Sequence, residues 1–488
     1  MKYPIPATML MAAALSVAAQ ETTPGYLDTA FGRKPYIMEP RHTGSLQPTM
    51  HTDEQHPKRH PGIYTIPEVL ERSYTRAVKE LRSGWEFFPS TPQHFAPYLD
   101  SIFVPGNTCV QPCNVIPHDG ISTTAQHLKT RLSRIGLQYS LTLSANYTGI
   151  SPKSHGGRNH FTSTNNSFAG TWYLLKKRDN SQGLFLSIEA DWGHGFNFNE
   201  RKSSVQNTIG SLSNPQGSLR GGNGVYIPHL ALGYSAFDGK WVGMVGTIDT
   251  SSYLDQNIYA ASWNGNLTNS AFGSNPCLPL EWANWGYLTA WQPCKNFYAM
   301  YATTGCNGQI NHNPFQYISA DAWVHLAELG FITDDFAGLG EGTYRLQYTI
   351  TRNEGKTGCG AAINVQQQLG HGSQLGFFSR CGVMDTDAAT VSNVRSAATA
   401  GLVLQAPFSS SGWGSAANND QVALGFLWER AAQSPHRHKD EYGLELSAVV
   451  QITPTFFIQP DLQYIFNPVQ QTDRSGELVF QVQGVFKF

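Results

Sequence analysis

Charged residues are scarce in this sequence of 488 residues, since Lys, Arg, Asp and Glu together make up only 14 % of it. Soluble globular proteins carry about 25 % charged residues. The formal net charge is only −2, so the chain lacks the basic field that attracts nucleic acid. We therefore expect no nucleic-acid partner, and the composition disfavours a soluble helical protein.

Long hydrophobic runs are also missing, and the mean hydropathy of −0.30 argues against a membrane protein built from helices. The apolar stretch at residues 7–17 is shorter than the roughly 20 residues of a spanning helix. It follows Lys2 and ends in the small residues 17–19, as a secretory signal peptide does. We predict a signal peptide at residues 1–19, with a short membrane anchor as the alternative.

Recognisable catalytic and metal-binding motifs are absent as well. The sequence has no Gly-x-Ser-x-Gly, no glycine-rich phosphate loop followed by Lys-Ser/Thr, and no His-Glu-x-x-His. The histidines at positions 42, 51, 56 and 60 are irregularly spaced and fit a solvated segment better than a metal site. We predict that the protein is not an enzyme and uses no cofactor or metal.

Seven cysteines in an exported chain favour disulfides. Cys359 and Cys381 flank an expected hairpin turn at residues 370–372. Folding the chain at that turn places the two cysteines nearly opposite each other, so we predict a disulfide between them. Cys109 and Cys113, which are close in sequence, are further disulfide candidates.

Polar and apolar residues alternate from about residue 128 onward, in segments separated by turns. This period of two predicts β-strands with one apolar face. A closed barrel is the β-structure that spans a bilayer, and the strands are too many for one ordinary soluble sandwich, which is the alternative. We predict an all-β fold, a transmembrane antiparallel β-barrel over residues 121–488, in the bacterial outer membrane and in contact with its lipid. The clearest apolar faces lie in residues 184–192, 344–350, 422–428, 444–452, 456–466 and 480–488.

Turn lengths predict how this barrel is oriented, because outer-membrane barrels have short periplasmic turns and longer extracellular loops. Tight turns are expected at residues 370–372 and 453–455, on the periplasmic side of a barrel whose C-terminus is periplasmic. The segment 407–420 falls on the same side although it is long. Longer, extracellular connections are expected at residues 353–359, 383–392, 431–441 and 468–477.

Ahead of the barrel, residues 20–120 are predicted to form a flexible periplasmic segment. Residues 20–66 are rich in Pro, His, Thr and charge and show little periodicity. Residues 67–83 predict one short helix, with Pro67 in its first turn and apolar residues along one face. Such a helix serves as a plug of the pore, as a docking helix for a partner, or as a helix packed on the rim.

Residues 442–468 contain a distinctive series of short pieces: ITP at 452–454, QPDLQY at 459–464 and NP at 467–468. Similar pieces at 245–257, 374–382 and 400–403 extend the pattern. In this order they resemble the carbohydrate-selective porins of the OprB type, over roughly residues 120–488. The resemblance implies a sixteen-stranded barrel with a central channel and passive diffusion of sugars without a cofactor. About fourteen strands are clear in the sequence, so two more are expected in regions such as 285–325.

The sequence departs from the family pattern in three places. Residues 118–120 read His-Asp-Gly where the family has a Gly-Asp-Trp-Gly-Gly-like motif, and residues 409–413 replace a Pro-Gly-Arg turn. Residues 264–312 form a long insert. These departures concern the choice of solute more than the fold.

A sugar-selective pore needs hydrogen-bonding side chains and flat aromatic surfaces along a narrowed passage, with weak binding so that the solute leaves. The loop after Asp249, with Asp255, Asn257 and Tyr259, is expected to fold inward and narrow the channel. For each candidate, stiffening of the barrel wall is the alternative role. The predicted solute contacts are Glu189, Asp191, Arg345, Glu445, Asp461 and Gln463 on polar strand faces, and Trp263 on the loop.

The sequence thus predicts an outer-membrane porin that lets carbohydrates diffuse passively and selectively. A general or anion-selective porin is the first alternative, and clustered lumen Lys and Arg residues would favour it. A barrel partner in polysaccharide export and a barrel enzyme or adhesin are further alternatives. Carbohydrate solutes and outer-membrane lipid are the expected partners, and assembly as a homo-oligomer is compatible with the sequence.

Overall fold

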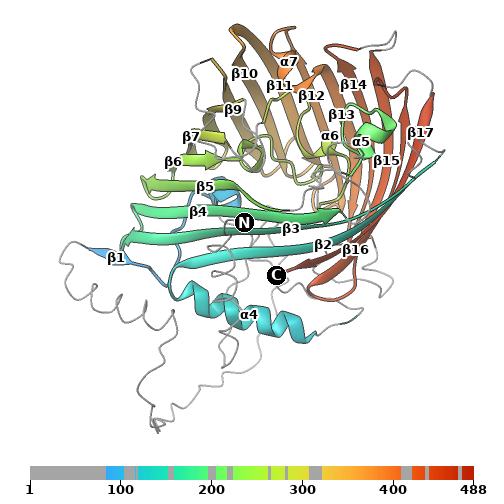
Figure 1. Cartoon of the computed structure of the whole chain (residues 1–488). Coiled ribbons are helices and arrows are strands. Elements are labelled where there is room, and N and C mark those ends of the chain that lie inside the picture. Colours follow the sequence, from blue (N-terminus) through green and yellow to red (C-terminus); the bar gives the residue numbers. More distant parts are fainter. Residues whose placement is uncertain are drawn as a thin grey trace, which may run out of the picture.

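A closed antiparallel barrel of sixteen strands forms the body of the protein in the computed structural model (Figure 1). Each strand from β2 to β17 pairs with the next one along the chain, and β17 pairs back with β2. The predicted fold class and strand number are therefore confirmed. The structure describes residues 84–103, 116, 119–151, 159–195, 205–216, 224–261, 265–280, 284–306, 321–407, 420–434, 439–470 and 475–488.

The elements follow one another in a regular up-and-down order, with short helices in the connections. The barrel strands are β2 (Leu137–Ser151), β3 (His160–Lys177), β4 (Gly183–Gly195), β5 (Gly224–Ala236), β6 (Trp241–Ile248), β7 (Asn284–Cys294), β8 (Phe297–Gly305), β9 (Trp323–Thr333), β10 (Gly342–Asn353), β11 (Lys356–Gln368), β12 (Leu375–Met384), β13 (Val394–Gln405), β14 (Gln421–Ala431), β15 (Asp440–Gln451), β16 (Phe456–Phe466) and β17 (Gly476–Lys487). The remaining elements are β1 (Trp85–Phe87), α3 (Pro97–Phe103), α4 (Gly120–Ser133), α5 (Val205–Ile209), η1 (Thr250–Ser252), α6 (Ser270–Gly273) and α7 (Ala389–Ser392).

The alternation of the sequence places apolar side chains on the outer surface and, on strands such as β17, polar side chains inside. In β17, Leu478 and Phe480 are exposed on the outer surface, whereas Gln481 and Gln483 are buried within the barrel. The same alternation governs β15, where Leu444 is exposed outside. Three strands, β7 to β9, lie in or at the edge of the region 285–325, where the sequence pattern was ambiguous. Their residues complete the count of sixteen.

The two ends of the barrel differ in the length of their connections. The turns at 369–374 and 452–455 lie at the end that carries the C-terminus, as predicted, and the long connection 406–420 lies at the same end. The opposite end carries the loops 196–223 and 249–283. One expectation is wrong: β10 and β11 are joined by only Glu354 and Gly355, because the strand ladder continues to the pair Asn353–Lys356.

Residues 120–133 form helix α4, not the beginning of the strand region at residue 128. Leu128 and Leu132 are spaced by four residues, which suits a helix as well as a strand. The Asp119 side chain caps the helix by accepting a hydrogen bond from the Ser122 backbone N–H. The strand region therefore starts at Leu137. Figure 1 shows α4 beside the end of the barrel at which the C-terminus lies.

Two further elements of the N-terminal segment were not predicted from the sequence. Strand β1 pairs with β3 at Trp85–Lys177, beyond the point where the pairing of β2 with β3 ends at Leu137–Trp172. Helix α3 packs on the inner face of the barrel. No helix among the described residues is long and apolar enough to cross a membrane. The predicted signal peptide at 1–19 and helix at 67–83 lie outside the described residues.

Asp119 also fastens α4 to the barrel, since the Thr455 hydroxyl donates a hydrogen bond of 3.0 Å to its carboxylate. Burial opposes ionisation of Asp119, but hydrogen bonds from Thr453, Ser122 and Thr455 outweigh it and hold its pKa below the usual value. The ionised Asp119 carboxylate therefore stabilises the folded state. This stabilisation is present above the unfolded-state pKa of about 3.9 and is lost as the pH falls through the folded-state pKa.

We expect Asp119→Ala to lower the free energy of unfolding by about 0.5–2 kcal/mol, the usual cost of losing an N-cap. Asp119→Asn keeps a capping oxygen but cannot ionise, so its stability near neutral pH should stay closer to that of the wild type. Urea titrations in lipid vesicles between acidic and neutral pH measure both effects. An acid-dependent loss that is equal in Asp119→Asn and in the wild type would contradict this role of the carboxylate.

The predicted disulfide between Cys359 and Cys381 is wrong, and both residues are free thiols. In the β11–β12 ladder Cys381 lies opposite Ile363, four residues along the strand from Cys359. Four residues of β-strand span roughly 13 Å, whereas the Cα atoms of a disulfide lie at most about 7 Å apart. The turn is centred one to two residues further along the chain than expected, which shifts the register. Cys109 and Cys113 lie outside the described residues.

Candidate functional site

The connection between β6 and β7 folds into the barrel and crosses it; we call residues 249–283 the inner loop. Its described parts are 249–261 and 265–280. Asp255 contacts β9, β10, β11 and β12, whereas Thr268 and Asn269 contact β15 on the other side. Because β15 lies seven strands from β6 and eight from β7 in a ring of sixteen, the loop spans the lumen. The predicted inward fold of this loop is thus present in the structure (Figure 1).

Arg380 of β12 is the main clamp on the inner loop. Its guanidinium lies 2.9 Å from the Asp255 carboxylate and donates hydrogen bonds to the backbone carbonyls of Asp255, Ala260 and Phe272 at 2.8, 3.1 and 2.7 Å. Its side chain is 1 % exposed and that of Asp255 is fully buried. A planar fork of five N–H donors suits a site where several acceptors converge from different directions.

Asp255 joins this clamp to a second buried ion pair. The Asp255 backbone N–H donates to Glu328 Oε2 at 2.8 Å, and Glu328 lies 3.9 Å from Arg345. The amides of Gln347 and Asn364 donate to Asp255 Oδ1 at 2.9 and 2.7 Å. Two carboxylates thus face two guanidiniums, so this part of the lumen carries no net charge.

The far end of the inner loop is held by Glu445 and Gln463. Glu445 accepts hydrogen bonds from the backbone N–H groups of Thr268 and Asn269, the second at 3.1 Å. Gln463 donates to the Thr268 hydroxyl at 2.7 Å and to Asp461 at 2.8 Å. These three side chains of β15 and β16 form one buried cluster beneath the loop.

Glycines on the inner face make room for aromatic rings of the inner loop. A Cβ atom added to Gly376 of β12 would clash with the ring of Tyr259, and one added to Gly425 of β14 would meet the ring of Phe272 at 2.7 Å. Contacts below 3.0 Å force one side to move. The loop therefore lies directly against the barrel wall at these two strands.

Helix α3 covers a second part of the inner wall. Leu99 and Phe103 belong to an apolar cluster with inward side chains of β3 to β9, among them Tyr173, Phe185 and Tyr298. Tyr98 stacks on Tyr298 with ring centroids 3.8 Å apart. Where α3 packs, the inward side chains of these strands are largely apolar and are buried against the helix.

A third part of the inner wall is polar and uncharged; we call it the polar wall. It spans three neighbouring strands, β17, β2 and β3, and its side chains are buried within the barrel. The ladders pair Gln481 with Thr148, Gln483 with Asn146, and Asn146 with Ser163. The members of the polar wall are Asn146, Thr148, Ser163, Asn165, Gln481 and Gln483.

The structure separates the predicted solute contacts into different groups. Arg345 lies against Tyr98 of α3, with its guanidinium carbon 5.9 Å from the ring centroid, and Glu445, Asp461 and Gln463 lie together under the inner loop. Glu189 and Asp191 lie on β4, beside a shift of register in its pairing with β5. Trp263 lies outside the described residues.

Sequence reasoning missed Glu328, Gln347, Asn364 and the clamping role of Arg380. Glu328 is a lone carboxylate on an inner strand face that otherwise carries Val324 and Leu326. A single acidic residue on the same strand face as inward apolar residues is the sequence feature that would have identified Glu328 as a candidate. No group of three or more His, Cys, Asp or Glu side chains in the described part of the chain is arranged to hold a metal ion.

A sixteen-stranded barrel with an apolar outer surface and a loop folded across its lumen defines a channel protein of the porin class. The model of the OprB family of carbohydrate-selective porins matches residues 134–488. The chain belongs to this family of carbohydrate-selective porins. Family and fold indicate a channel rather than an enzyme, located in the outer membrane.

Solved structures with a similar fold include the high-pH structure of Pseudomonas putida OprB, at 16 % sequence identity and a TM-score of 0.56. That alignment covers 72 % of this chain and 94 % of the other. The low-pH structure of P. putida OprB gives 15 % identity, coverage of 72 % and 93 %, and a TM-score of 0.43. A mutant of the Rh. blastica porin gives 10 % identity, coverage of 72 % and 100 %, and a TM-score of 0.47. A comparison with curated protein sequences finds no match.

Proposed function

We propose that carbohydrates cross the outer membrane through this barrel along the polar wall, beside the inner loop. The observation that carries the proposal is the uncharged hydrogen-bonding character of that wall. Amides and hydroxyls offer donors and acceptors to sugar hydroxyls at the strength of neutral hydrogen bonds, about 1 kcal/mol each. Weak, repeated contacts of this kind let a solute bind and then leave.

The other two parts of the inner wall are covered by α3 and the inner loop, whereas the polar wall receives a hydrogen bond of 2.6 Å from Gln216 of the β4–β5 connection to the Thr148 hydroxyl. The apolar part packs against α3, and the buried ion pairs hold the inner loop. We therefore assign Arg345, Glu445, Asp461 and Gln463 to positioning of α3 and the loop. Glu189 and Asp191 stay candidates for solute contact. Trp263 lies outside the described residues and also stays a candidate.

The charges on β14 to β16 bear on the alternative of an anion-selective pore. Along the described length of these strands the inward residues include the carboxylates Glu429, Glu441, Glu445 and Asp461, and no inward Lys or Arg. A wall that attracts anions needs clustered cations. The inner face of β14 to β16 therefore favours neutral solutes over anions.

The test is a liposome-swelling assay with monosaccharides, oligosaccharides and size-matched neutral amino acids. We expect faster entry of sugars than of amino acids of equal size; equal rates would defeat carbohydrate selectivity.

The route is tested with Asn146→Leu and Gln483→Leu. Each variant should slow sugar entry about fivefold at concentrations below saturation, the effect of losing one neutral hydrogen bond. Asn166→Leu is the matched control, because Asn166 alternates with Asn165 on β3 and faces outward. If sugar entry in the two wall variants equals that of the control, the solute does not use the polar wall.

A further inference from the structure

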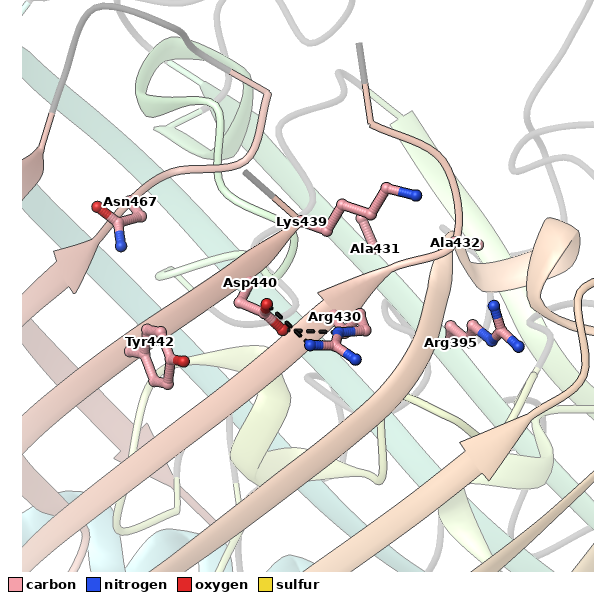
Figure 2. A pocket seen from close by; sticks show the side chains of 8 residues that line it. All are labelled: Arg395, Arg430, Ala431, Ala432, Lys439, Asp440, Tyr442 and Asn467. Atoms are coloured by element: carbon pink, nitrogen blue, oxygen red, sulfur yellow. Dashed lines mark hydrogen bonds and ion pairs between the residues drawn. The ribbon is translucent and has the colours of Figure 1, made fainter. Parts of the chain in front are cut away.

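A basic pocket lies on the surface of the barrel at the end of β14 and the beginning of β15; we call it the rim pocket. Its volume is about 500 Å³. Figure 2 shows the Arg430–Asp440 ion pair in the pocket, with the side chains of Arg395, Lys439 and Tyr442 around it. The lining is completed by Ala431, Ala432 and Asn467.

The position of the rim pocket along the strands is set by outward aromatic side chains next to it. Trp428 and Tyr442 are register partners on β14 and β15, and Tyr442 is in turn paired with Phe466 of β16. Further along the same faces, Phe426 and Leu444 are exposed apolar residues. Aromatic girdles of this kind mark the interface between hydrocarbon and headgroups. The rim pocket therefore lies at headgroup level.

The pocket belongs to the end of the barrel that carries the long loops. It is formed where β14 ends and β15 begins, at the same end as the connections 196–223 and 249–283. Long connections are extracellular in outer-membrane barrels. The pocket therefore faces the outer leaflet of the membrane.

The rim pocket carries a local excess of positive charge. Three cations, Arg395, Arg430 and Lys439, face one carboxylate, Asp440, which gives a net charge of +2 in a chain whose total is −2. Asp440 is already engaged, since Arg430 donates to its two oxygens at 2.8 and 3.0 Å and the Trp428 indole donates at 3.1 Å. In the described part of the chain, Arg395 and Lys439 have no ion pair and no side-chain hydrogen bond.

A break in the strand ladder accounts for the placement of Arg395. Val394 pairs with Ala431 and Ser396 with Arg430, so Arg395 is an extra residue in β13, at a β-bulge. A bulge at a barrel rim redirects a side chain without ending the strand. Here it leaves Arg395 exposed beside Arg430, where its charge adds to that of the pocket.

We propose that the rim pocket binds the phosphorylated headgroup of a glycolipid in the outer leaflet. Arg395 offers a planar fork of donors and Lys439 a mobile point charge, and both are suited to a phosphate. The Asn467 amide and the Tyr442 hydroxyl line the same pocket and suit the hydroxyls of a sugar. A lipid, rather than free phosphate, is the occupant because the exposed apolar faces of β14 and β15 continue directly below, where acyl chains lie.

The experiment measures lipid binding to the detergent-solubilised full chain by native mass spectrometry. The probes are lipid A with both phosphates, the same lipid without phosphates, and inorganic phosphate alone. The test variant is Arg395→Gln with Lys439→Gln. The matched control is Lys240→Gln with Lys295→Gln, which removes two exposed cations at the opposite end of the barrel.

Removing two cations at headgroup level should weaken binding of bisphosphorylated lipid A by about 30-fold, and the control pair should change it by less than twofold. The dephosphorylated lipid should bind the wild type as weakly as bisphosphorylated lipid A binds the test variant. Equal loss in test and control variants would overturn the site. Binding of inorganic phosphate as tight as that of the lipid would overturn the assignment to a lipid. Unchanged sugar swelling in the test variant establishes that the barrel is intact.

Discussion

Replacing Arg380 with alanine is expected to release the inner loop and to raise the conductance of the pore. The substitution removes the charge that faces Asp255 and the donors to three loop carbonyls. Breaking a buried ion pair from one side costs about 3–5 kcal/mol. The strand ladder does not depend on Arg380, so this cost falls on docking of the loop. Single-channel conductance and swelling rates for oligosaccharides should therefore increase relative to those for monosaccharides.

Two further variants make the result specific. Arg380→Lys keeps the charge but has three donors on a point-like ammonium, so it should release the loop in part. Arg352→Ala breaks an exposed pair with Asp321, 3.1 Å long, and should change stability by less than about 1 kcal/mol and leave conductance unchanged. Wild-type conductance and wild-type size discrimination in Arg380→Ala would show that the clamp does not hold the loop.

Strand faces were predictable from the sequence because successive residues of a barrel strand point alternately outward and inward. The outward faces of β15, β16 and β17 follow directly from the alternation around Leu444, Leu462 and Phe480. Helix α4 was not predicted because the spacing of apolar residues at 128–132 suits a helix as well as a strand. The cysteine pairing failed because a small error in the turn moves every partner along the ladder.

The site was less predictable than the barrel because its contacts join residues far apart in the chain. That the loop after Asp249 folds inward was expected, but Arg380 and Asp255 are 125 positions apart and no local pattern links them. Arg345 and Glu445 were placed correctly on inner faces. The alternation of residues along a strand does not show whether an inward side chain contacts solute or a segment of the chain that folds into the barrel, such as α3 or the inner loop.

Replacing Leu99 with aspartate is expected to undock α3 from the inner wall. Leu99 is fully buried among apolar side chains. An unpaired carboxylate in that position costs several kcal/mol, more than a helix of seven residues gains from one face. The barrel should still fold, with a raised conductance and faster proteolysis of residues 84–103. Ile121→Asp, on the exposed face of α4, is the matched control and should change neither measurement.

Leu99→Asp and Arg380→Ala should not act independently, because α3 and the inner loop share Glu328. The ring of Tyr298 stacks on that of Tyr98 of α3, and the Tyr298 hydroxyl donates a hydrogen bond of 2.7 Å to Glu328 Oε1. The Asp255 backbone N–H donates one of 2.8 Å to Glu328 Oε2. Groups in one buried network couple by about 0.5–3 kcal/mol. Undocking either element should therefore loosen the other, and the double variant should raise conductance by less than the sum of the single increases. Strictly additive increases would mean that the helix and the loop fill the lumen as separate units.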